Sequence, residues 1–310
     1  MYDLGIIGAG PAGYVAAEKA GKNGLKTVMF DKRFLGGVCL NEGCIPTKTL
    51  LYSAKIFDNA KDGSKYGIFA DKLTFDYSLM VERKNKVVKK LVAGISAKMK
   101  AHNIEVVMGE AYIKGKSAEG YVINCNNTEY ICKNLIIATG SEALIPPIKG
   151  LDKVKYYTNR EILEIKEVPS NLAIIGGGVI GIEFASLFST FGTKVTIIEM
   201  LDEILPGIDR QFSAQLRQEL IKKGVNFYLN SKVINVSEKE IVFEKDGKNE
   251  SLTYEKLLVS VGRKANLTGF GLENTGVEVM KNGIKIDNNC RTNIPNIYAA
   301  GDITGFSLLA

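Results

Sequence analysis

The chain has 310 residues, of which 45% are apolar and 24% charged, a composition typical of a soluble globular protein large enough for two domains. Its 40 basic and 34 acidic residues are scattered, and the densest basic run, residues 84–90, falls within a helical pattern, which favours a solvated helix face over a nucleic-acid patch. No run of 18 apolar residues is present, so the sequence predicts no membrane span.

The first elements predict a dinucleotide-binding turn. A short buried strand is expected over residues 3–7, followed by the glycine-rich residues 8–13, an alanine-rich helix over 14–22 and a second strand over 27–30. The pattern G-x-G-x-x-G in this context allows a tight turn, close approach of the backbone to a pyrophosphate and close helix packing. Asp31 lies 18 positions after Gly13 (31 − 13), where an acidic residue binds a ribose hydroxyl.

Two cysteines, Cys39 and Cys44, precede the next predicted helix. Pro46 suits the first turn of that helix, where its missing N–H costs nothing, so Cys44 is expected at the helix N-terminus, where the dipole favours a thiolate. Lys48 follows one turn later on the same face. This arrangement predicts a redox-active dithiol; a zinc site would need two further Cys or His ligands, and no metal is expected.

A helical and then a strand-rich region follow. After turn-rich residues 61–72, a long helix with an apolar stripe for core packing is predicted over 75–102. Residues 104–137 predict an antiparallel meander with turns at residues 114–115 and 126–127. The two cysteines of this region, Cys125 and Cys132, have no motif around them and are interpreted as structural thiols, and a linker is expected at Pro146-Pro147.

The opening pattern then repeats. A strand over 171–175, a glycine turn over 176–181, a helix over 182–191 and a strand over 195–198 lead to Glu199, again 18 positions after the last glycine (199 − 181). Two fingerprints with equal internal spacing predict two dinucleotide sites. The second should prefer NAD to NADP, because Glu199 would accept a hydrogen bond from a 2′-hydroxyl and repel a 2′-phosphate, and residues 200–202 offer no arginine.

The remaining sequence predicts a second meander over 225–257, a strand over 257–261 that leads into Gly262-Arg263, and a final short strand after Pro295-Asn296. That strand ends at Gly301-Asp302. By itself this last pattern is only a strand running into a turn.

Together, the two fingerprints, the paired cysteines and the closing residues Ala-Ala-Gly-Asp resemble the flavoprotein (pyridine nucleotide) disulfide reductase family over essentially the whole chain. Residues 36–48, GGVCLNEGCIPTK, are similar nearly residue for residue to the redox motif of the members that oxidise dihydrolipoamide. Thr47 matches the small hydroxyl residue of those members, whereas Glu42 departs from the valine often found between the cysteines.

The resemblance implies roles for particular residues. The first fingerprint would bind the FAD pyrophosphate, with Asp302 on the ribitol–phosphate portion, and the second would bind NAD. Lys48 and Glu183 would pair beside the flavin and nicotinamide rings, although a helix-face charge and a helix N-terminal acid are the simpler interpretations of these two. The implied catalytic residues are Cys39, Cys44, Lys48 and Glu183, and the implied cofactor-binding residues are Gly8, Gly10, Pro11, Ala12, Gly13, Asp31, Lys32, Gly37, Val38, Lys48, Thr139, Gly140, Gly176, Gly178, Gly181, Glu199, Gly262, Arg263, Gly301 and Asp302.

The implied fold is α/β, with two doubly wound Rossmann-like nucleotide-binding domains that each carry an antiparallel β-meander. We expect a discontinuous FAD-binding domain, residues 1–145 plus 269–310, with the NAD-binding domain, residues 146–268, inserted into it.

The implied activity is the NAD-dependent oxidation of dihydrolipoamide to lipoamide through a Cys39–Cys44 disulfide and FAD. The substrate would be carried on a lipoyl carrier protein, and the full-length enzyme would be a homodimer, with no nucleic-acid or membrane partner. Family members continue into a C-terminal interface domain that supplies a catalytic His–Glu pair, whereas this sequence stops at Ala310, in what is expected to be a helix start, and its only histidine, His102, matches no motif. We therefore expect a truncated form without its dimerisation domain, its base or its full turnover.

Three alternatives remain open. A thioredoxin reductase type is disfavoured, because that type carries C-x-x-C in its NAD domain and residues 146–268 contain no cysteine. A glutathione or mercuric reductase type fits Thr47 and Glu199 less well. The third alternative is a catalytically inactive FAD- and NAD-binding fragment.

A cytoplasmic location is expected. Strand-like residues begin at Tyr2 and leave no room for a signal peptide. Five cysteines, an odd number without a secretion signal, argue against an extracellular disulfide framework.

Overall fold

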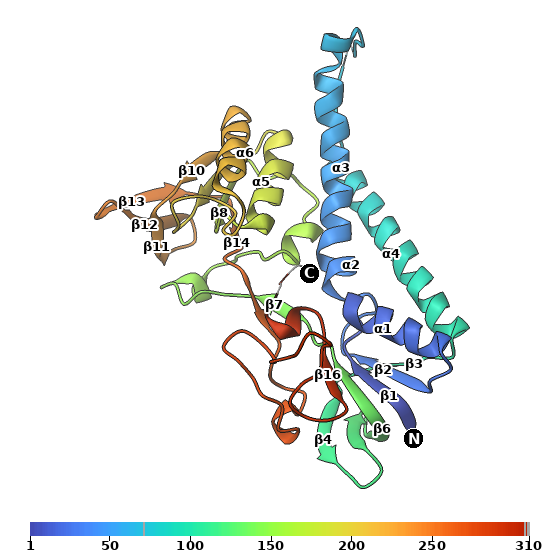
Figure 1. Cartoon of the computed structure of the whole chain (residues 1–310). Helices are drawn as coiled ribbons and strands as arrows, with labels where there is room; N and C mark the ends of the chain where they lie inside the picture. Colours follow the sequence, from blue (N-terminus) through green and yellow to red (C-terminus); the bar gives the residue numbers. More distant parts are fainter. Residues whose placement is uncertain (71, 307, 309–310) are drawn as a thin grey trace. The chain divides into compact units, whose positions relative to one another are not determined.

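The structure, a computed structural model, describes residues 1–70, 72–306 and 308. By its contacts the chain divides into two compact units (Figure 1). The first unit comprises Met1–Ile45, Val87–Glu142 and Arg263–Ala310, and the second comprises Pro46–Lys86 and Ala143–Gly262.

The first unit is built on a parallel sheet. Its strands are β1 (Tyr2–Ile7), β2 (Thr27–Asp31), β3 (Glu105–Met108), β6 (Thr128–Ile137) and β16 (Ile297–Ala299), and their order across the sheet is β3-β2-β1-β6-β16. Because the chain starts in the middle of this sheet and winds outwards in both directions, the arrangement is doubly wound.

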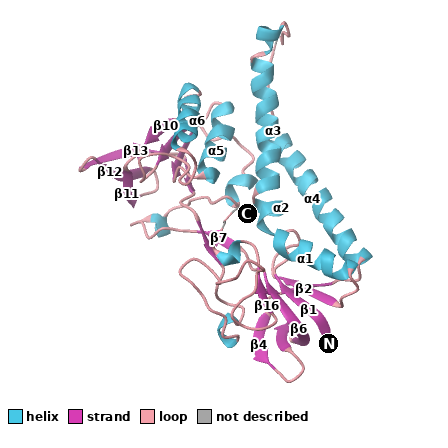
Figure 2. Cartoon of the chain, in the orientation of Figure 1, coloured by secondary structure: helices cyan, strands magenta, loops and turns pink. Residues whose placement is uncertain are grey.

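Both faces of this sheet are buried, which explains the nearly continuous apolar character of its central strands. Leu4 and Ile6 of β1 pack in one core cluster with helix α1 (Pro11–Lys22), while Ile7 packs in a second cluster on the opposite face. Figure 2 shows α1 beside the strands β1 and β2 that it connects. Successive side chains of a strand point to opposite faces, so a short apolar run supplies both cores.

An antiparallel meander extends the sheet through β4 (Tyr112–Lys116), β5 (Tyr121–Cys125) and β6. The predicted turn at Asn126-Asn127 is present, and both residues have the positive φ, 52° and 60°, of a tight hairpin turn. The predicted turn at residues 114–115 is wrong, because these residues lie within β4 at an irregularity in the register, where Gly115 has a φ of +138°. β3 was also expected in the meander, but it pairs in parallel with β2.

The second unit repeats the plan. The parallel strands β8 (Asn171–Ile175), β9 (Lys194–Ile198), β10 (Asn226–Tyr228) and β14 (Lys256–Val259) have the order β10-β9-β8-β14, and helices α5 (Val179–Thr190) and α6 (Arg210–Lys222) belong to the same unit. A separate antiparallel sheet contains β11 (Ser231–Val236), β12 (Glu240–Lys245) and β13 (Lys248–Thr253). As in the first unit, one strand expected in the meander, here β10, is a parallel strand of the main sheet.

Three helices follow the first βαβ turn in the sequence. They are α2 (Gly37–Glu42), α3 (Cys44–Lys61) and α4 (Tyr77–Ala101). The short helix α2 was not anticipated. The remaining short elements are strands β7 (Ser141–Ala143) and β15 (Arg263–Ala265), which pair, and 3-10 helices at Gly63–Tyr66, Leu151–Lys153, Glu161–Glu164, Leu272–Asn274 and Asp302–Thr304.

The predicted fold class, α/β with two doubly wound sheets each accompanied by a meander, is confirmed. The assignment of cofactors to residues 1–145 plus 269–310 and to 146–268 stays a prediction. The contact-based units differ from those ranges chiefly in grouping residues 46–86 with the second unit. The helix start expected over 306–310 falls largely on residues 307, 309 and 310, which lie outside the described residues, and among the described helices none is long and apolar enough to cross a membrane.

Candidate active site

The first glycine loop connects β1 to α1 and has the geometry of a phosphate cradle. Gly8 has a φ of +108°, and a Cβ built there would lie 2.1 Å from the Ala138 carbonyl oxygen. A Cβ on Gly13 would lie 1.8 Å from the Gly8 oxygen, so this glycine is needed for the helix to pack on the loop. Within the described residues no side chain caps the N-terminus of α1 at Gly10, which leaves first-turn N–H groups for an anion.

Asp31, at the end of β2, is held by three backbone N–H groups. Its Oδ2 accepts a hydrogen bond of 2.8 Å from Ala9 in the glycine loop. Its Oδ1 accepts hydrogen bonds from Arg33, at 2.8 Å, and from Phe34, at 3.1 Å. The predicted ribose acid is therefore fixed against the loop that it is expected to serve.

The second glycine loop, between β8 and α5, has the same construction. Gly176 has a φ of +106°, and a Cβ on Gly181 would lie 2.3 Å from the Gly176 oxygen. Gly178 begins α5 without a capping side chain among the described residues. Glu199 is 8% exposed, and its carboxylate accepts hydrogen bonds from the backbone N–H groups of Gly177, at 2.5 Å, and Leu201, at 2.8 Å.

The cysteine pair lies where α2 meets α3. Cys39 is within α2, and Cys44 is the first residue of α3, as predicted. Both are half-buried free thiols joined by a hydrogen bond, so the structure corresponds to the reduced dithiol. Burial, reinforced by the hydrogen bond to Cys44, raises the pKa of Cys39 to about 12, and the charge of Asp302 acts in the same direction. Cys39 is thereby favoured as the protonated thiol.

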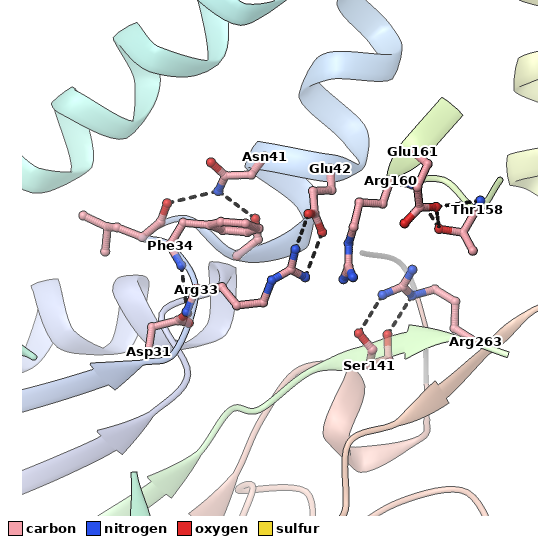
Figure 3. A network of polar contacts seen from close by, with 12 residues as sticks. Asp31, Arg33, Phe34, Asn41, Glu42, Ser141, Thr158, Arg160, Glu161 and Arg263 are labelled. Atoms are coloured by element: carbon pink, nitrogen blue, oxygen red, sulfur yellow. Dashed lines mark hydrogen bonds and ion pairs between the residues drawn. The ribbon is translucent and has the colours of Figure 1, made fainter. Parts of the chain in front are cut away.

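The first residue of α2, Gly37, lies against the first glycine loop. Gly37 has a φ of +64°, and a Cβ built there would lie 2.4 Å from Gly10 Cα. Arg33, before α2, and Glu42, at the end of α2, form a bidentate ion pair (Figure 3). Arg33 was not predicted as a site residue, and Glu42 was noted only as a departure from the family pattern. The available signal for this ion pair was the presence of opposite charges, Arg33 and Glu42, on either side of Gly36-Gly37.

Lys48 and Glu183 form an ion pair within the second unit, as the resemblance implied. Lys48 lies on α3 and Glu183 on α5, and their side chains are 64% and 22% exposed. The part of this pair in catalysis stays a prediction.

A second polar network lies in the first unit and includes Asp302, which is 7% exposed. Ser141 Oγ donates to Asp302 Oδ2 at 2.5 Å. Figure 3 shows Arg263 donating to both Oγ and the carbonyl oxygen of Ser141, each at 2.7 Å. Thr139 and Asn266 exchange two hydrogen bonds of 3.0 and 2.9 Å. Ser141 and Asn266 were not predicted, because no local motif marks them.

The other predicted residues occupy less constrained positions. Lys32 lies at the surface 3.6 Å from Glu110, and Val38 is a half-buried residue of α2. Gly140, Gly262 and Gly301 have φ values of +70°, +121° and +81°. Pro11 and Ala12 form the first turn of α1. In the described part of the chain, no group of three or more His, Cys, Asp or Glu side chains could hold a metal ion.

These loops, acids and cysteines are those of a nucleotide-dependent disulfide oxidoreductase, and the chain belongs to the pyridine nucleotide-disulphide oxidoreductase family, whose profile matches residues 2–309. It is similar to the dihydrolipoyl dehydrogenase of Acholeplasma laidlawii, at 41% identity over 314 residues, covering 100% of this chain and 92% of the relative. It is similar to the dihydrolipoyl dehydrogenase of Geobacillus stearothermophilus at 40% identity, covering 98% of this chain and 66% of the relative.

Among solved structures, the chain is similar to the HOCl-induced flavoprotein disulfide reductase RclA from Escherichia coli. The TM-score is 0.85 at 31% identity, and the match covers 99% of this chain and 67% of that one. The chain thus spans about two thirds of the length of RclA and of the Geobacillus relative. Family membership makes the chain an oxidoreductase and implies a flavin cofactor.

Proposed function

We propose that the chain is a dihydrolipoyl dehydrogenase, which oxidises dihydrolipoamide to lipoamide with NAD+ as the electron acceptor. The observation that carries this proposal is the pair of hydrogen-bonded thiols, with Cys39 in α2 and Cys44 at the first position of α3. The substrate follows from the relatives named dihydrolipoyl dehydrogenase and from the redox motif at residues 36–48.

The residues of the first unit fit FAD. Gly8 and Gly10 form a cradle that a Cβ on Gly8 would fill, and the uncapped start of α1 offers N–H groups to a pyrophosphate. Asp31 would accept from the adenosine ribose, and Asp302 would lie against the ribitol–phosphate portion. When bound, FAD supplies the two-electron carrier between the dithiol and the nicotinamide.

The thiol chemistry is assigned to the two cysteines. A substrate thiolate attacks Cys39 Sγ in the Cys39–Cys44 disulfide, the S–S bond breaks, and Cys44 leaves as a thiolate. The second substrate thiol, losing its proton, attacks the substrate sulfur bonded to Cys39 and releases cyclic lipoamide, and Cys39 takes up a proton. The substrate loses two electrons and two protons, and the cysteines gain the electrons. The first turn of α3 stabilises the charge on Cys44, while its environment keeps Cys39 protonated.

The second glycine loop and Glu199 are proposed to bind NAD. Glu199 would use remaining acceptor capacity for the adenosine ribose, and its charge would disfavour the 2′-phosphate of NADP. The Lys48–Glu183 ion pair would hold the lysine ammonium and the carboxylate in one fixed geometry beside the reacting rings.

Three further statements stay predictions of this proposal. The dihydrolipoamide would be presented on a lipoyl carrier protein, the active enzyme would be a homodimer, and the location would be the cytoplasm. None of them is needed for the cysteine chemistry.

A second candidate function is nucleotide binding with no dithiol turnover. The observation that favours it is the position of His102, because dithiol turnover in the family uses a catalytic histidine and His102 is the only histidine of the sequence. A Cβ built on Gly21 would lie 2.7 Å from His102 O and 2.9 Å from His102 Cβ, so this residue packs against the end of α1. It is a half-buried residue after the last turn of α4 and matches no catalytic arrangement.

The test compares two activities in the purified chain: dihydrolipoamide oxidation by NAD+, and NADH oxidation by an artificial dye. Cys39→Ser and Cys44→Ser should each lower the first activity by roughly 10⁴-fold and leave the second largely intact. Cys290→Ser, at an exposed cysteine, is the matched control and should retain both. Dihydrolipoamide oxidation that survives either substitution contradicts the mechanism. Dye reduction without any dihydrolipoamide oxidation in the unaltered chain supports the second candidate.

A further inference from the structure

One charged side chain stands between the two cysteines. Glu42 is the last residue of α2, and its side chain is 11% exposed. Arg33 Nη1 donates to Glu42 Oε2 at 3.1 Å, and Arg33 Nη2 donates to Oε1, so the guanidinium engages both carboxylate oxygens. Bidentate arginine–carboxylate pairs of this kind are stronger and geometrically more specific than ion pairs with a single hydrogen bond.

Arg33 is itself attached to the first glycine loop. Its backbone N–H donates to Asp31 Oδ1 (Figure 3), and Asp31 Oδ2 accepts from the Ala9 N–H. Its guanidinium carbon also lies 4.6 Å from the centre of the Phe34 ring. A continuous set of polar contacts therefore runs from Ala9 through Asp31 and Arg33 to Glu42.

The beginning of α2 is attached independently of Glu42. The Asn41 amide donates to the carbonyl oxygens of Leu35, at 3.1 Å, and Gly37, at 2.9 Å, and the Gly36 N–H donates to Ala9 O at 2.9 Å. Only Gly43 separates Glu42 from Cys44. The Arg33–Glu42 pair thus holds the C-terminal end of α2, which is joined to Cys44 through Gly43.

We propose that Arg33 and Glu42 are positioning residues that hold Cys39 within bonding reach of Cys44 and so set the equilibrium between dithiol and disulfide. The inference rests on the proposed function only in taking Cys39 and Cys44 as the redox couple. It concerns how easily the couple is reduced and makes no assumption about which dithiol the enzyme oxidises.

The physical reason is the entropy of ring closure. A disulfide forms within a chain in proportion to the effective concentration of one sulfur at the other, which falls when the intervening segment gains freedom. Loss of the pair would release the end of α2, disfavour the closed disulfide and make it easier to reduce. With dithiothreitol as reductant, the exchange converts the protein disulfide and the reagent dithiol into the protein dithiol and the cyclic reagent disulfide, with two electrons transferred.

The experiment equilibrates the whole chain in dithiothreitol buffers of graded oxidised-to-reduced ratio, quenches in acid and alkylates the free thiols. Cleavage at lysine only, after Lys32 and after Lys48, places both cysteines in one peptide in every variant, and the mass of this peptide reports the disulfide fraction. Arg33→Met and Glu42→Gln should each shift the equilibrium about tenfold towards the dithiol, equivalent to about +30 mV for a two-electron couple. The exchanged pair Arg33→Glu with Glu42→Arg should return it towards the value of the unaltered chain.

The matched control is Arg217→Met, which breaks a pair of the same bidentate kind and similar burial with Glu203 in the second unit, and it should leave the equilibrium unchanged. An unchanged equilibrium in both test variants overturns the inference. Shifts of the equilibrium in opposite directions in Arg33→Met and Glu42→Gln also overturn it. They would show that the uncompensated charge, and not the freedom gained by the end of α2, is responsible. If Arg33→Met does not fold, Glu42→Gln alone decides. A chain that forms no disulfide even in the most oxidising buffer contradicts the proposed redox couple itself, which is a distinguishable result.

Discussion

The carboxylate of Glu199 accepts a hydrogen bond of 2.5 Å from the backbone N–H of Gly177, the second residue of the second glycine loop. Asp31 accepts one of 2.8 Å from Ala9, the corresponding residue of the first loop, and in both cases the acid lies 22 residues after its donor. Each acid therefore links its glycine loop to the end of the following strand, β2 for Asp31 and β9 for Glu199. Asp31 and Glu199, the two acids predicted to bind a ribose, thus also have a structural role.

The NAD preference can be tested at this carboxylate. Glu199→Ala removes an ionised acceptor from two backbone N–H groups and from the expected ribose hydroxyl, at about 1.5–3 kcal/mol for a hydrogen bond to a charged group. NADH affinity should fall at least about tenfold, NADPH affinity should fall less, and the ratio of the two dissociation constants should narrow. Glu203→Ala, at a nearby acid paired with Arg217, is the control and should keep the ratio. An unaltered ratio in Glu199→Ala would contradict the assignment.

Gly37→Ala tests the contact between the first residue of α2 and the first glycine loop. The new Cβ would lie 2.4 Å from Gly10 Cα at a φ of +64°, so the alanine must displace backbone in addition to adopting a left-handed conformation. Gly24→Ala provides the comparison, because Gly24 has a φ of +77° and no atom within 4 Å of its added Cβ, and it should cost only about 1–2 kcal/mol.

Urea unfolding and the flavin content per chain measure this difference. Gly37→Ala should be clearly the less stable of the two variants and should retain less flavin. Equal unfolding free energies and equal flavin content would show that Gly37 does not lie against the first glycine loop as described.

Tyr77→Phe should stabilise the second unit. The Tyr77 hydroxyl is buried near Phe188 and Phe191 and finds no hydrogen-bond partner among the described residues. Removal of an unsatisfied buried hydroxyl recovers a desolvation penalty of about 1–3 kcal/mol. Tyr254→Phe is the matched opposite, since the Tyr254 hydroxyl donates to Ser237 O at 2.6 Å, and it should destabilise. Thermal unfolding of both variants measures the effect, and a destabilised Tyr77→Phe would show that the hydroxyl has a partner.

The pH dependence of alkylation tests the environment of Cys39. In the reduced chain burial raises the pKa of Cys39 to about 12, above the ordinary cysteine value of about 8.5. The raised value favours the thiol, so at pH 8 Cys39 should react with iodoacetamide much more slowly than exposed Cys290, and its rate should rise about tenfold per pH unit over the alkaline range in which the chain stays folded. Peptide masses after timed quenching report the rate, with exposed Cys290 as the internal reference. Equal rates for the two residues at pH 8 would contradict this environment.

The glycine loops and the cysteine pair could be predicted because their geometry is local: a few residues with fixed spacing determine each turn and helix start. β3 and β10 were assigned to meanders, because apolar alternation does not reveal that a short strand pairs in parallel with β2 or β9. Gly115 gives the same signal in a bulge as in a turn. Contacts such as Ser141 to Asp302, 161 residues apart, depend on sheet register and on loop conformation, which no local pattern encodes.

The central claim is that this chain holds FAD beside a working Cys39–Cys44 couple and accepts electrons from NADH. The most direct test is the visible spectrum of the purified chain during an anaerobic titration with NADH. We predict a flavin absorption band that bleaches on addition of NADH and a long-wavelength shoulder that Cys44→Ser abolishes. A colourless protein, or a flavin band that NADH leaves unchanged, would contradict the account.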